Sequence, residues 1–321
     1  MSKPQQILVI GAGELGAQVI QALVQHPLRT TAHISVLLRP SSITPPDRDR
    51  AQELSHLRIQ GVKYIPADIA LDTESHLTSI FRTFDTVIGC TGFSAGRGMQ
   101  VKIARAVLAA KVPRYIPWQF GVNYDAIGRG SAQDLFDEQL DVRDMLRCAA
   151  GTSDSGDNHS KTQWVIISTG MFTSFLFEPS FGVVDILNRR VTALGHQDNQ
   201  VSVTAVEDIG RVTAEVVLGP ESDSAFDNKV IYVAGDTLTY AKLGDLVESL
   251  VPGKSRIERN VKTVQEARDD LAREPNNTLF KYQVVFGEGR GVAWDLAETW
   301  NRKVGIKTMT VEEWARTHSL V

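Results

Sequence analysis

The segment from Gln6 to Leu23, QILVIGAGELGAQVIQAL, constrains the fold of this chain more than any other stretch. Residues Ile7 to Ile10 form a short apolar run that a glycine ends, which is typical of a buried parallel strand. After the turn GAGELG, apolar residues recur at helical spacing from Leu15 onward. A strand, a G-x-G-x-x-G turn and a helix in this order form the fingerprint of a dinucleotide-binding unit.

Each glycine of this turn has a predicted task. Gly11 allows the tight turn, Gly13 lets the backbone approach a pyrophosphate, and Gly16 lets the helix pack closely on the strand. Glu14 and Leu15 begin the helix, whose first N–H groups and positive dipole end favour phosphate oxygens. Glycine-rich turns are also common without a ligand, so a purely structural turn is the alternative.

The residues after the second predicted strand, His33 to Leu38, indicate which dinucleotide is bound. An acidic side chain at this place accepts from the ribose hydroxyls of NAD, whereas an arginine accommodates the 2′-phosphate of NADP. Here Arg39 is followed closely by the hydroxyls of Ser41 and Ser42, and no carboxylate is adjacent. The pattern favours NADPH/NADP+, and the alternative is an arginine that is merely solvated at a strand end.

Four further strands are predicted over residues 62–66, 86–90, 114–117 and 163–168. Ligands of doubly wound sheets bind at the carboxyl ends of the strands, so the residues that follow them should line the cleft. Asp68, after the third strand, is a plausible edge for the adenine ring. The remaining cofactor contacts expected at these ends are Thr91, Gly92, Phe93 and Gln119.

The fourth strand also leads into Gly92-Phe93-Ser94-Ala95-Gly96, which has the G-x-S-x-G form of a hydrolase nucleophile elbow. Such an enzyme needs a downstream acid and histidine, and the sequence offers histidines at positions 159, 196 and 318. None of them lies in a segment that points clearly back to Ser94. Because glycines are equally expected beside a dinucleotide in this loop, a serine hydrolase is the minor alternative.

Composition excludes several functional classes. The net charge of −4 and the pI near 6.0 leave no basic footprint for nucleic acid. No apolar run is long enough to span a bilayer, and the N-terminus lacks the charged and apolar regions of a signal peptide. Cys90 and Cys148 form no C-x-x-C pair, and we expect both to be buried thiols. These features predict a cytoplasmic protein without a metal site, a nucleic-acid partner or a membrane partner.

Alternating strands and helices predict an α/β fold, a Rossmann-type doubly wound parallel sheet with a smaller C-terminal α/β domain. We expect residues 1–170 to form the NADP-binding domain, with 201–235 packing back on it, and residues 171–321 to form the substrate domain. A helix is predicted over residues 204–218, with Thr204 as its N-cap and Glu207 completing a capping box.

Aromatic residues cluster where the second domain begins, with four phenylalanines between residues 172 and 181. They can form a small hydrophobic core or an apolar wall for a substrate beside the nicotinamide, and we expect them to do both. The predicted substrate contacts are Phe93, Trp118, Met171, Phe172 and Phe175.

Several segments together resemble one branch of the atypical short-chain dehydrogenases. They are GAGELG, LLRPSS, the helix that contains Gln100, and RYIPWQFGVNYD. The chain looks most similar to the NmrA-like and isoflavone-reductase-like branch, and DEQLDVRDMLR and STGMFTSFLFEP resemble its fungal members. The resemblance covers nearly the whole chain. It implies NADPH bound at Gly11, Gly13, Gly16 and Arg39, and hydride transfer to a small aromatic or secondary-metabolite substrate.

The resemblance also bears on the proton donor. Short-chain dehydrogenases usually carry Tyr-x-x-x-Lys, and no tyrosine here has a lysine at that spacing. The isoflavone-reductase-like enzymes instead use a lysine on the helix after the FG loop, and the matching position in FDEQLDVR is Gln139. A glutamine can hydrogen-bond a carbonyl but cannot give up a proton near neutral pH.

Three alternatives follow from this glutamine. Tyr124 or Asp125 supplies the proton, or the substrate is an activated group that needs hydride but little acid help. The third alternative is a sensor of the NmrA type, which binds dinucleotide without turnover and signals through a protein partner. We expect the reductase, because a sensor needs no substrate-sized apolar pocket.

Overall fold

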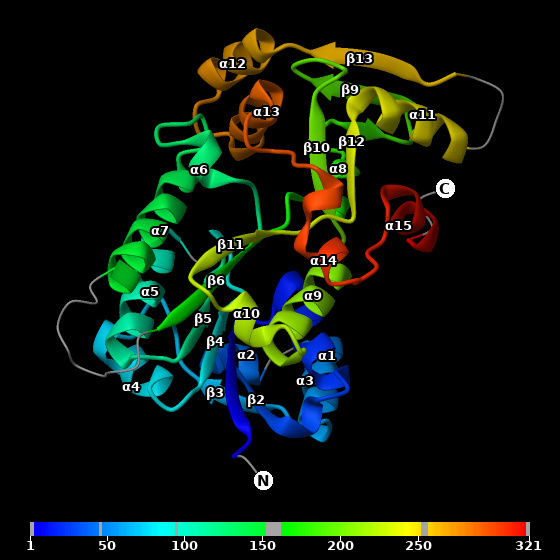
Figure 1. The fold of residues 1–321 in the computed structure, drawn as a ribbon. Coiled ribbons are helices and arrows are strands. Elements are labelled where there is room, and N and C mark those ends of the chain that lie inside the picture. The colour runs from blue at the N-terminus through cyan, green and yellow to red at the C-terminus, as the bar shows by residue number, and fades with distance from the viewer. Residues whose placement is uncertain (1–2, 45–46, 94–95, 152–161, 252–255, 319–321) are drawn as a thin grey trace. The chain divides into compact units, whose positions relative to one another are not determined.

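The computed structural model describes residues 3–44, 47–93, 96–151, 162–251 and 256–318. The chain divides into two compact units, each assembled from three separate segments (Figure 1). The first unit contains Met1–Gln119, Asp141–Ile167 and Ile209–Val230. The second contains Phe120–Leu140, Ser168–Asp208 and Ile231–Val321. The assignment of cofactor and substrate to separate domains stays a prediction.

The first unit is built on a seven-stranded sheet in the order β11-β6-β5-β4-β1-β2-β3 (Figure 1). Strands β1 to β6 pair in parallel, and their order is that of a doubly wound Rossmann sheet. The strand order reverses between β1 and β4. The predicted fold class is therefore confirmed. The strands are β1 Gln5–Ile10, β2 Ala32–Leu38, β3 Lys63–Pro66, β4 Thr86–Gly89, β5 Arg114–Ile116, β6 Gln163–Ser168 and β11 Lys229–Tyr232.

Helices connect these strands and bury their apolar stripes. In α1, the residues predicted at helical spacing are the buried ones, from Leu15 to Leu23. A core of fully buried side chains, among them Leu8, Phe81 and Val107, surrounds the central strands. The helical elements are α1 Glu14–Gln25, η1 Arg29–Thr31, α2 Pro40–Ile43, α3 Arg48–Ile59, α4 Glu74–Phe81, α5 Met99–Ala110, α7 Leu135–Gly151, α9 Val206–Leu218 and α10 Ser222–Ala225.

The second unit contains two three-stranded sheets, in the orders β12-β10-β7 and β13-β9-β8. Their strands are β7 Met171–Phe172, β8 Val184–Asp185, β9 Arg190–Leu194, β10 Gln200–Thr204, β12 Asp236–Thr239 and β13 Glu258–Lys262. The remaining helices are α6 Tyr124–Ile127, α8 Thr173–Leu176, α11 Tyr240–Leu250, α12 Val264–Arg273, α13 Thr278–Glu288, η3 Leu296–Glu298, α14 Trp300–Lys303 and α15 Val311–Thr317.

The structure corrects the predicted start of the helix over residues 204–218. Helix α9 begins at Val206, and Thr204 is the last residue of β10. The Thr204 hydroxyl donates to the Thr169 carbonyl oxygen (2.6 Å), so it serves the strand rather than the helix. The predicted N-cap is therefore wrong.

The structure contains one helix that the sequence analysis does not predict, and it corrects the prediction for one cysteine. Helix α3 begins at Arg48, and Leu54 is its one buried large side chain among those described, so no apolar stripe marks the helix. Cys90 is buried as predicted, whereas Cys148 is exposed. Cys148 follows the buried Leu146 by two positions, which places it on the opposite side of α7.

Candidate functional site

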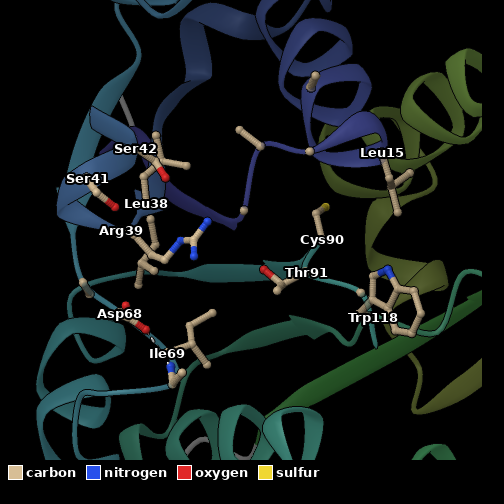
Figure 2. Close-up of a pocket in the computed structure, with 18 of the residues that line it drawn as sticks. Leu15, Leu38, Arg39, Ser41, Ser42, Asp68, Ile69, Cys90, Thr91 and Trp118 are labelled. Carbon is tan, nitrogen blue, oxygen red and sulfur yellow. Dashed lines mark hydrogen bonds between the residues drawn. The ribbon is translucent and has the colours of Figure 1, made fainter. Parts of the chain in front are cut away.

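A cavity of about 1310 Å³ opens in the first unit where β1, β2, β3 and β4 end (Figure 2). This is the point at which the strand order reverses, where doubly wound sheets bind ligands. Ten residues predicted from the sequence line it, from five separate segments of the chain. They are Gly11, Gly13, Glu14, Leu15, Arg39, Ser41, Asp68, Thr91, Gly92 and Trp118.

The glycine-rich turn forms the floor of this cavity at the amino end of α1. Gly11 has φ +93°, a conformation that favours glycine, and its N–H donates to the Leu37 carbonyl oxygen (3.1 Å). A Cβ at Gly16 would lie 2.3 Å from the Gly11 carbonyl oxygen. At Gly13 a Cβ would meet no atom within 4 Å, because that side of the turn faces open space. The turn is thus tight at two glycines and open at the third.

Thr91 lies beside this turn and has a restricted hydrogen-bonding role. Its hydroxyl donates to the Ile10 carbonyl oxygen (3.0 Å), and its own carbonyl oxygen accepts from the Gln100 side chain (2.7 Å). With its proton committed, the hydroxyl can only accept from a bound molecule. The neighbouring Cys90 also lines the cavity, but burial raises the pKa of its thiol, which keeps it protonated and unreactive.

The two ends of the cavity differ in chemistry. Figure 2 shows Arg39, Ser41 and Asp68 on one side and Leu15 and Trp118 on the other. The first end offers a guanidinium and a hydroxyl, which suit an anion. The second end is apolar and aromatic, and suits a flat ring.

The apolar end is tightly packed behind its surface. The rings of Phe93 and Trp118 meet edge to face with centroids 4.5 Å apart. A Cβ at Gly92 would lie 3.0 Å from the Trp118 ring, so glycine leaves room for the indole. Trp118 lines the cavity, and Phe93 supports it.

Three predicted cofactor residues are not among the described residues that line the cavity: Gly16, Phe93 and Gln119. Gln119 is fully buried, and its Oε1 accepts from Nε of Arg143 at 2.7 Å. Arg143, in α7, is itself fully buried. This bond orients the amide of Gln119, with its oxygen toward the guanidinium.

The two predicted catalytic residues belong to the second unit, which includes α7 as far as Leu140, and both are buried. Gln139 in α7 has no exposed surface, and Tyr124 in α6 is 3% exposed. The Tyr124 ring lies edge-on to Phe136, with centroids 4.9 Å apart. The catalytic roles of both residues stay predictions.

An aromatic chain runs through the second unit and includes the predicted substrate residue Phe175. Tyr282, which sequence analysis missed, contacts both Phe136 (5.9 Å) and Phe175 (6.0 Å), and Phe175 stacks on Phe181 (4.4 Å). Burial raises the pKa of Tyr282 to about 12, so it remains a neutral phenol. Met171 is buried, while Phe172 and Phe175 are half-buried. These phenylalanines therefore contribute to a core, as expected.

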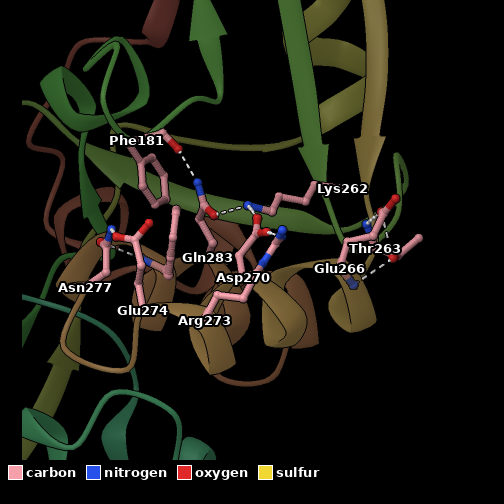
Figure 3. Close-up of polar contacts among 10 residues, drawn as sticks. Phe181, Lys262, Thr263, Glu266, Asp270, Arg273, Glu274, Asn277 and Gln283 are labelled. Atoms are coloured by element: carbon pink, nitrogen blue, oxygen red, sulfur yellow. Dashed lines mark hydrogen bonds and ion pairs between the residues drawn. The ribbon is translucent and has the colours of Figure 1, made fainter.

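A polar network holds α13, the helix of Tyr282, in place (Figure 3). Gln283 donates to the Phe181 carbonyl oxygen (2.8 Å) and accepts from Lys262 (2.6 Å), which also pairs with Asp270. The hydrogen bond from Lys262 holds the pKa of Asp270 below its usual value. The network joins β13, α12 and α13.

The residues of the hydrolase alternative are not brought together in the described part of the chain. Ser94 and His159 lie outside the described residues. His196 lies beside Asp198 (3.4 Å), and His318 stacks on Trp314 and contacts Glu207 (3.2 Å). The two described histidines thus have structural neighbours in the second unit.

Several cavity residues were missed by sequence analysis. They are Ala12, Ala17, Leu37, Leu38, Glu53, Ala67, Ile69, Ala70, Leu71 and Cys90. Most of them are apolar residues next to predicted ones. The predicted ends of the strands were the sequence signal that could have identified them. Glu53 had none, because it comes from α3, which was not predicted.

Within the described ranges, none of the helices combines the length and the apolar character needed to cross a bilayer.

Comparisons with known proteins agree with this architecture. The sequence profile of the NmrA-like family matches residues 3–315. An NmrA-like family domain-containing oxidoreductase from Gibberella moniliformis is 41% identical over 315 residues, which cover 98% of each chain.

Solved structures share the fold. An isoflavone reductase matches with a TM-score of 0.74 at 18% identity, over 98% of this chain and 100% of its own. A leucoanthocyanidin reductase from Vitis vinifera in complex with NADPH gives 0.74 at 16% identity, over 98% and 100%. A quinone oxidoreductase from Escherichia coli, NADPH-dependent and complexed with NADPH, gives 0.70 at 19%, over 98% and 100%.

Proposed function

Because this chain belongs to the NmrA-like family, we propose that it is an NADPH-dependent reductase. Its substrate is a small aromatic or secondary-metabolite molecule, reduced at a C=O, C=C or C=N bond. The observation that carries this proposal is the cavity at the strand-order reversal, with a glycine-rich turn at its floor and Arg39 at one end. The oxidoreductase relative from Gibberella moniliformis supports the reaction class.

The residues of the cavity fit NADPH. The open side of Gly13 leaves room for a pyrophosphate against the amino end of α1, where unpaired N–H groups attract anions. The Arg39 guanidinium and the Ser41 hydroxyl suit the 2′-phosphate that distinguishes NADPH from NADH. Leu15 and Trp118 give the apolar surroundings that a nicotinamide needs.

When bound, NADPH supplies the hydride through its nicotinamide ring. The chain's own residues position the two reacting molecules. Trp118, backed by Phe93, gives a rigid aromatic surface at one end of the cavity. Met171, Phe172 and Phe175 are proposed to hold the substrate, and the half-buried rings of the two phenylalanines suit an aromatic molecule.

The reaction also needs a proton donor. Gln139 can hydrogen-bond a carbonyl oxygen but cannot release a proton near neutral pH. We assign the donor to the Tyr124 phenol, or to solvent where the substrate is activated enough to need little acid help. The variant Gln139→Lys tests this assignment of the donor, because a lysine at this position could donate a proton to the substrate. If Tyr124→Phe leaves turnover unchanged, Tyr124 is not the donor.

The proposed function is tested by titration of the protein with NADPH and NADH. The oxidation of NADPH is then followed against a panel of aromatic ketones, enones and imines. Tighter binding of NADPH than NADH, with substrate-dependent oxidation, is the expected result. If neither dinucleotide binds, the cofactor assignment is wrong.

One observation favours a second function, a non-catalytic dinucleotide sensor that acts through a protein partner. The buried Gln139 occupies the position where the resemblance implies a catalytic lysine. Tight NADPH binding without turnover across the whole panel would select the sensor over the reductase.

A further inference from the structure

Residues 68–72, which follow β3 at the cavity, form a turn with its own internal hydrogen bonds. Asp68 Oδ1 accepts from the N–H groups of Ala70 (2.9 Å) and Leu71 (3.3 Å). The N–H of Asp68 donates to Asp72 Oδ2 (2.7 Å), and the N–H of Asp72 donates to the Asp68 carbonyl oxygen (2.8 Å). These bonds set the shape of the turn independently of any ligand.

A second element holds the turn from outside. Lys102 extends from α5, and its ammonium donates to the carbonyl oxygens of Ile69 (2.6 Å) and Ala70 (3.3 Å). The ammonium has three donors, and two of its hydrogen bonds go to neutral backbone carbonyl groups of this turn. The turn is therefore fixed against α5 as well as within itself.

This rigid turn presents an apolar side chain to solvent. Leu71 is 84% exposed and lines the cavity, while its neighbour Ile69 is 8% exposed. Other large apolar side chains that are exposed in the described residues do not line it: Leu28, Ile59, Leu187 and Val261. An exposed leucine on a preordered turn is suited to cover a flat apolar ring that enters the cavity.

The place of the turn in the cavity indicates which ring Leu71 covers. Figure 2 places Asp68 and Ile69 on the same side as Arg39 and Ser41, the residues proposed to hold the 2′-phosphate of the adenosine ribose. The ring next to that ribose is adenine.

On the basis of the proposed function, we propose that Leu71 is a cofactor contact that covers the adenine ring. Lys102 is a positioning residue that acts through residues 68–72, because it fixes the turn on which Leu71 stands. Leu71 and the turn that Lys102 fixes thereby bind the adenosine half of the cofactor.

Adenosine 2′,5′-bisphosphate tests this proposal, because it carries the adenine and the 2′-phosphate but no nicotinamide. Calorimetric titration compares the wild-type chain with Leu71→Ser and Lys102→Met. We expect Leu71→Ser to weaken binding roughly tenfold, and Lys102→Met to weaken it by about three- to tenfold. Both variants should melt close to the wild-type temperature, since Leu71 is exposed and Lys102 bonds a surface turn.

Matched control variants show whether the loss of nucleotide affinity comes from these two positions or from the loss of any exposed leucine or lysine. Leu187→Ser removes a leucine that is 93% exposed and remote in sequence, and Lys242→Met removes an exposed lysine of α11; neither should change the affinity. Lys102→Arg should restore most of the binding, because arginine can also donate to carbonyl oxygens. In the double variant the loss should be close to that of Leu71→Ser alone, since Lys102 acts through Leu71.

The possible results are distinguishable. If the wild-type chain binds the nucleotide and both variants bind it equally well, the roles of Leu71 and Lys102 are refuted while the cofactor assignment stands. If Lys102→Met and Leu71→Ser add fully, Lys102 does not act through Leu71. If the wild-type chain does not bind the nucleotide, the proposed function is overturned and this proposal with it.

Discussion

Two glycines of one turn should respond to substitution in opposite ways. Gly16 lies inside α1, where alanine is intrinsically better than glycine by about 1 kcal/mol. However, the new Cβ would lie 2.3 Å from the Gly11 carbonyl oxygen and 2.9 Å from its carbon, and backbone atoms cannot move aside as a side chain can. Overpacking of this kind costs about 1–3 kcal/mol or more. We therefore expect Gly16→Ala to lower the free energy of unfolding despite the gain in helix propensity.

Gly13 is the N-cap of α1 and faces open space. Its φ of −73° and ψ of −164° suit any residue, and aspartate is among the best N-caps. Gly13→Asp should therefore leave stability unchanged or raise it by about 0.5–1 kcal/mol. The added carboxylate would point where the pyrophosphate is proposed to bind. Two like charges about 4 Å apart repel by about 4 kcal/mol at an effective dielectric constant of 20, which predicts NADPH affinity at least 100-fold weaker.

Thermal unfolding and NADPH titration of the same two variants measure both effects. For a unit of this size, about 1 kcal/mol corresponds to a shift of roughly 2–4 °C in melting temperature. Gly16→Ala should melt several degrees lower, and Gly13→Asp should melt at or above the wild-type temperature and bind NADPH at least 100-fold more weakly. Wild-type stability of Gly16→Ala would refute the packing argument. Wild-type NADPH affinity of Gly13→Asp would refute the placement of the pyrophosphate.

Three further predictions concern charge. Arg39→Ala should weaken NADPH binding by about 10- to 100-fold, the worth of a charge-assisted bond to phosphate, and leave NADH affinity unchanged; titration with both dinucleotides would expose an error if the ratio of affinities does not move. Backbone hydrogen bonds in two capping boxes hold the pKa values of Glu266 and Glu313 below their usual 4.5. The stability that these two carboxylates contribute is thus present above pH 4.5 and is lost as the pH falls through their lowered pKa values. The melting temperature of the double variant Glu266→Gln/Glu313→Gln should therefore fall less than that of the wild type between about pH 5 and 3. An equal fall in both proteins would contradict this. Arg143→Met should lower the free energy of unfolding by about 1–3 kcal/mol, because the buried Oε1 of Gln119 loses its hydrogen bond from the Arg143 guanidinium; urea unfolding with an unchanged midpoint would count against it.

Most of the proposed cofactor site could be predicted from local sequence patterns. The strand, the glycine turn and the helix follow one another within eighteen residues, so their geometry is set by neighbours in the chain. The same applies to Arg39 and Thr91, which directly follow strands whose apolar runs are plain in the sequence. Their carboxyl ends meet at one edge because parallel strands must.

Features that depend on distant packing were not predictable in this way. Lys102 and the turn at residues 68–72 are about thirty positions apart, and no periodic pattern connects a lysine to two carbonyl oxygens. Glu53 reached the cavity from a helix without an apolar stripe. Thr204 has the sequence context of an N-cap, but its hydroxyl donates to the Thr169 carbonyl oxygen instead. In each case a tertiary contact outweighed the local preference.

The discontinuous first unit has a consequence for how this chain is made. Strand β6 ends at Ser168, and its partner β11 begins at Lys229, about sixty residues later. A ribosome adding about 5–20 residues per second needs roughly 3–12 s to cover that stretch. During this interval the nascent sheet has an open edge beside β6, which is a template for pairing with another chain. We therefore expect chaperones to protect the newly synthesised protein until Val230 has emerged from the ribosome. Slower translation between these strands should increase aggregation.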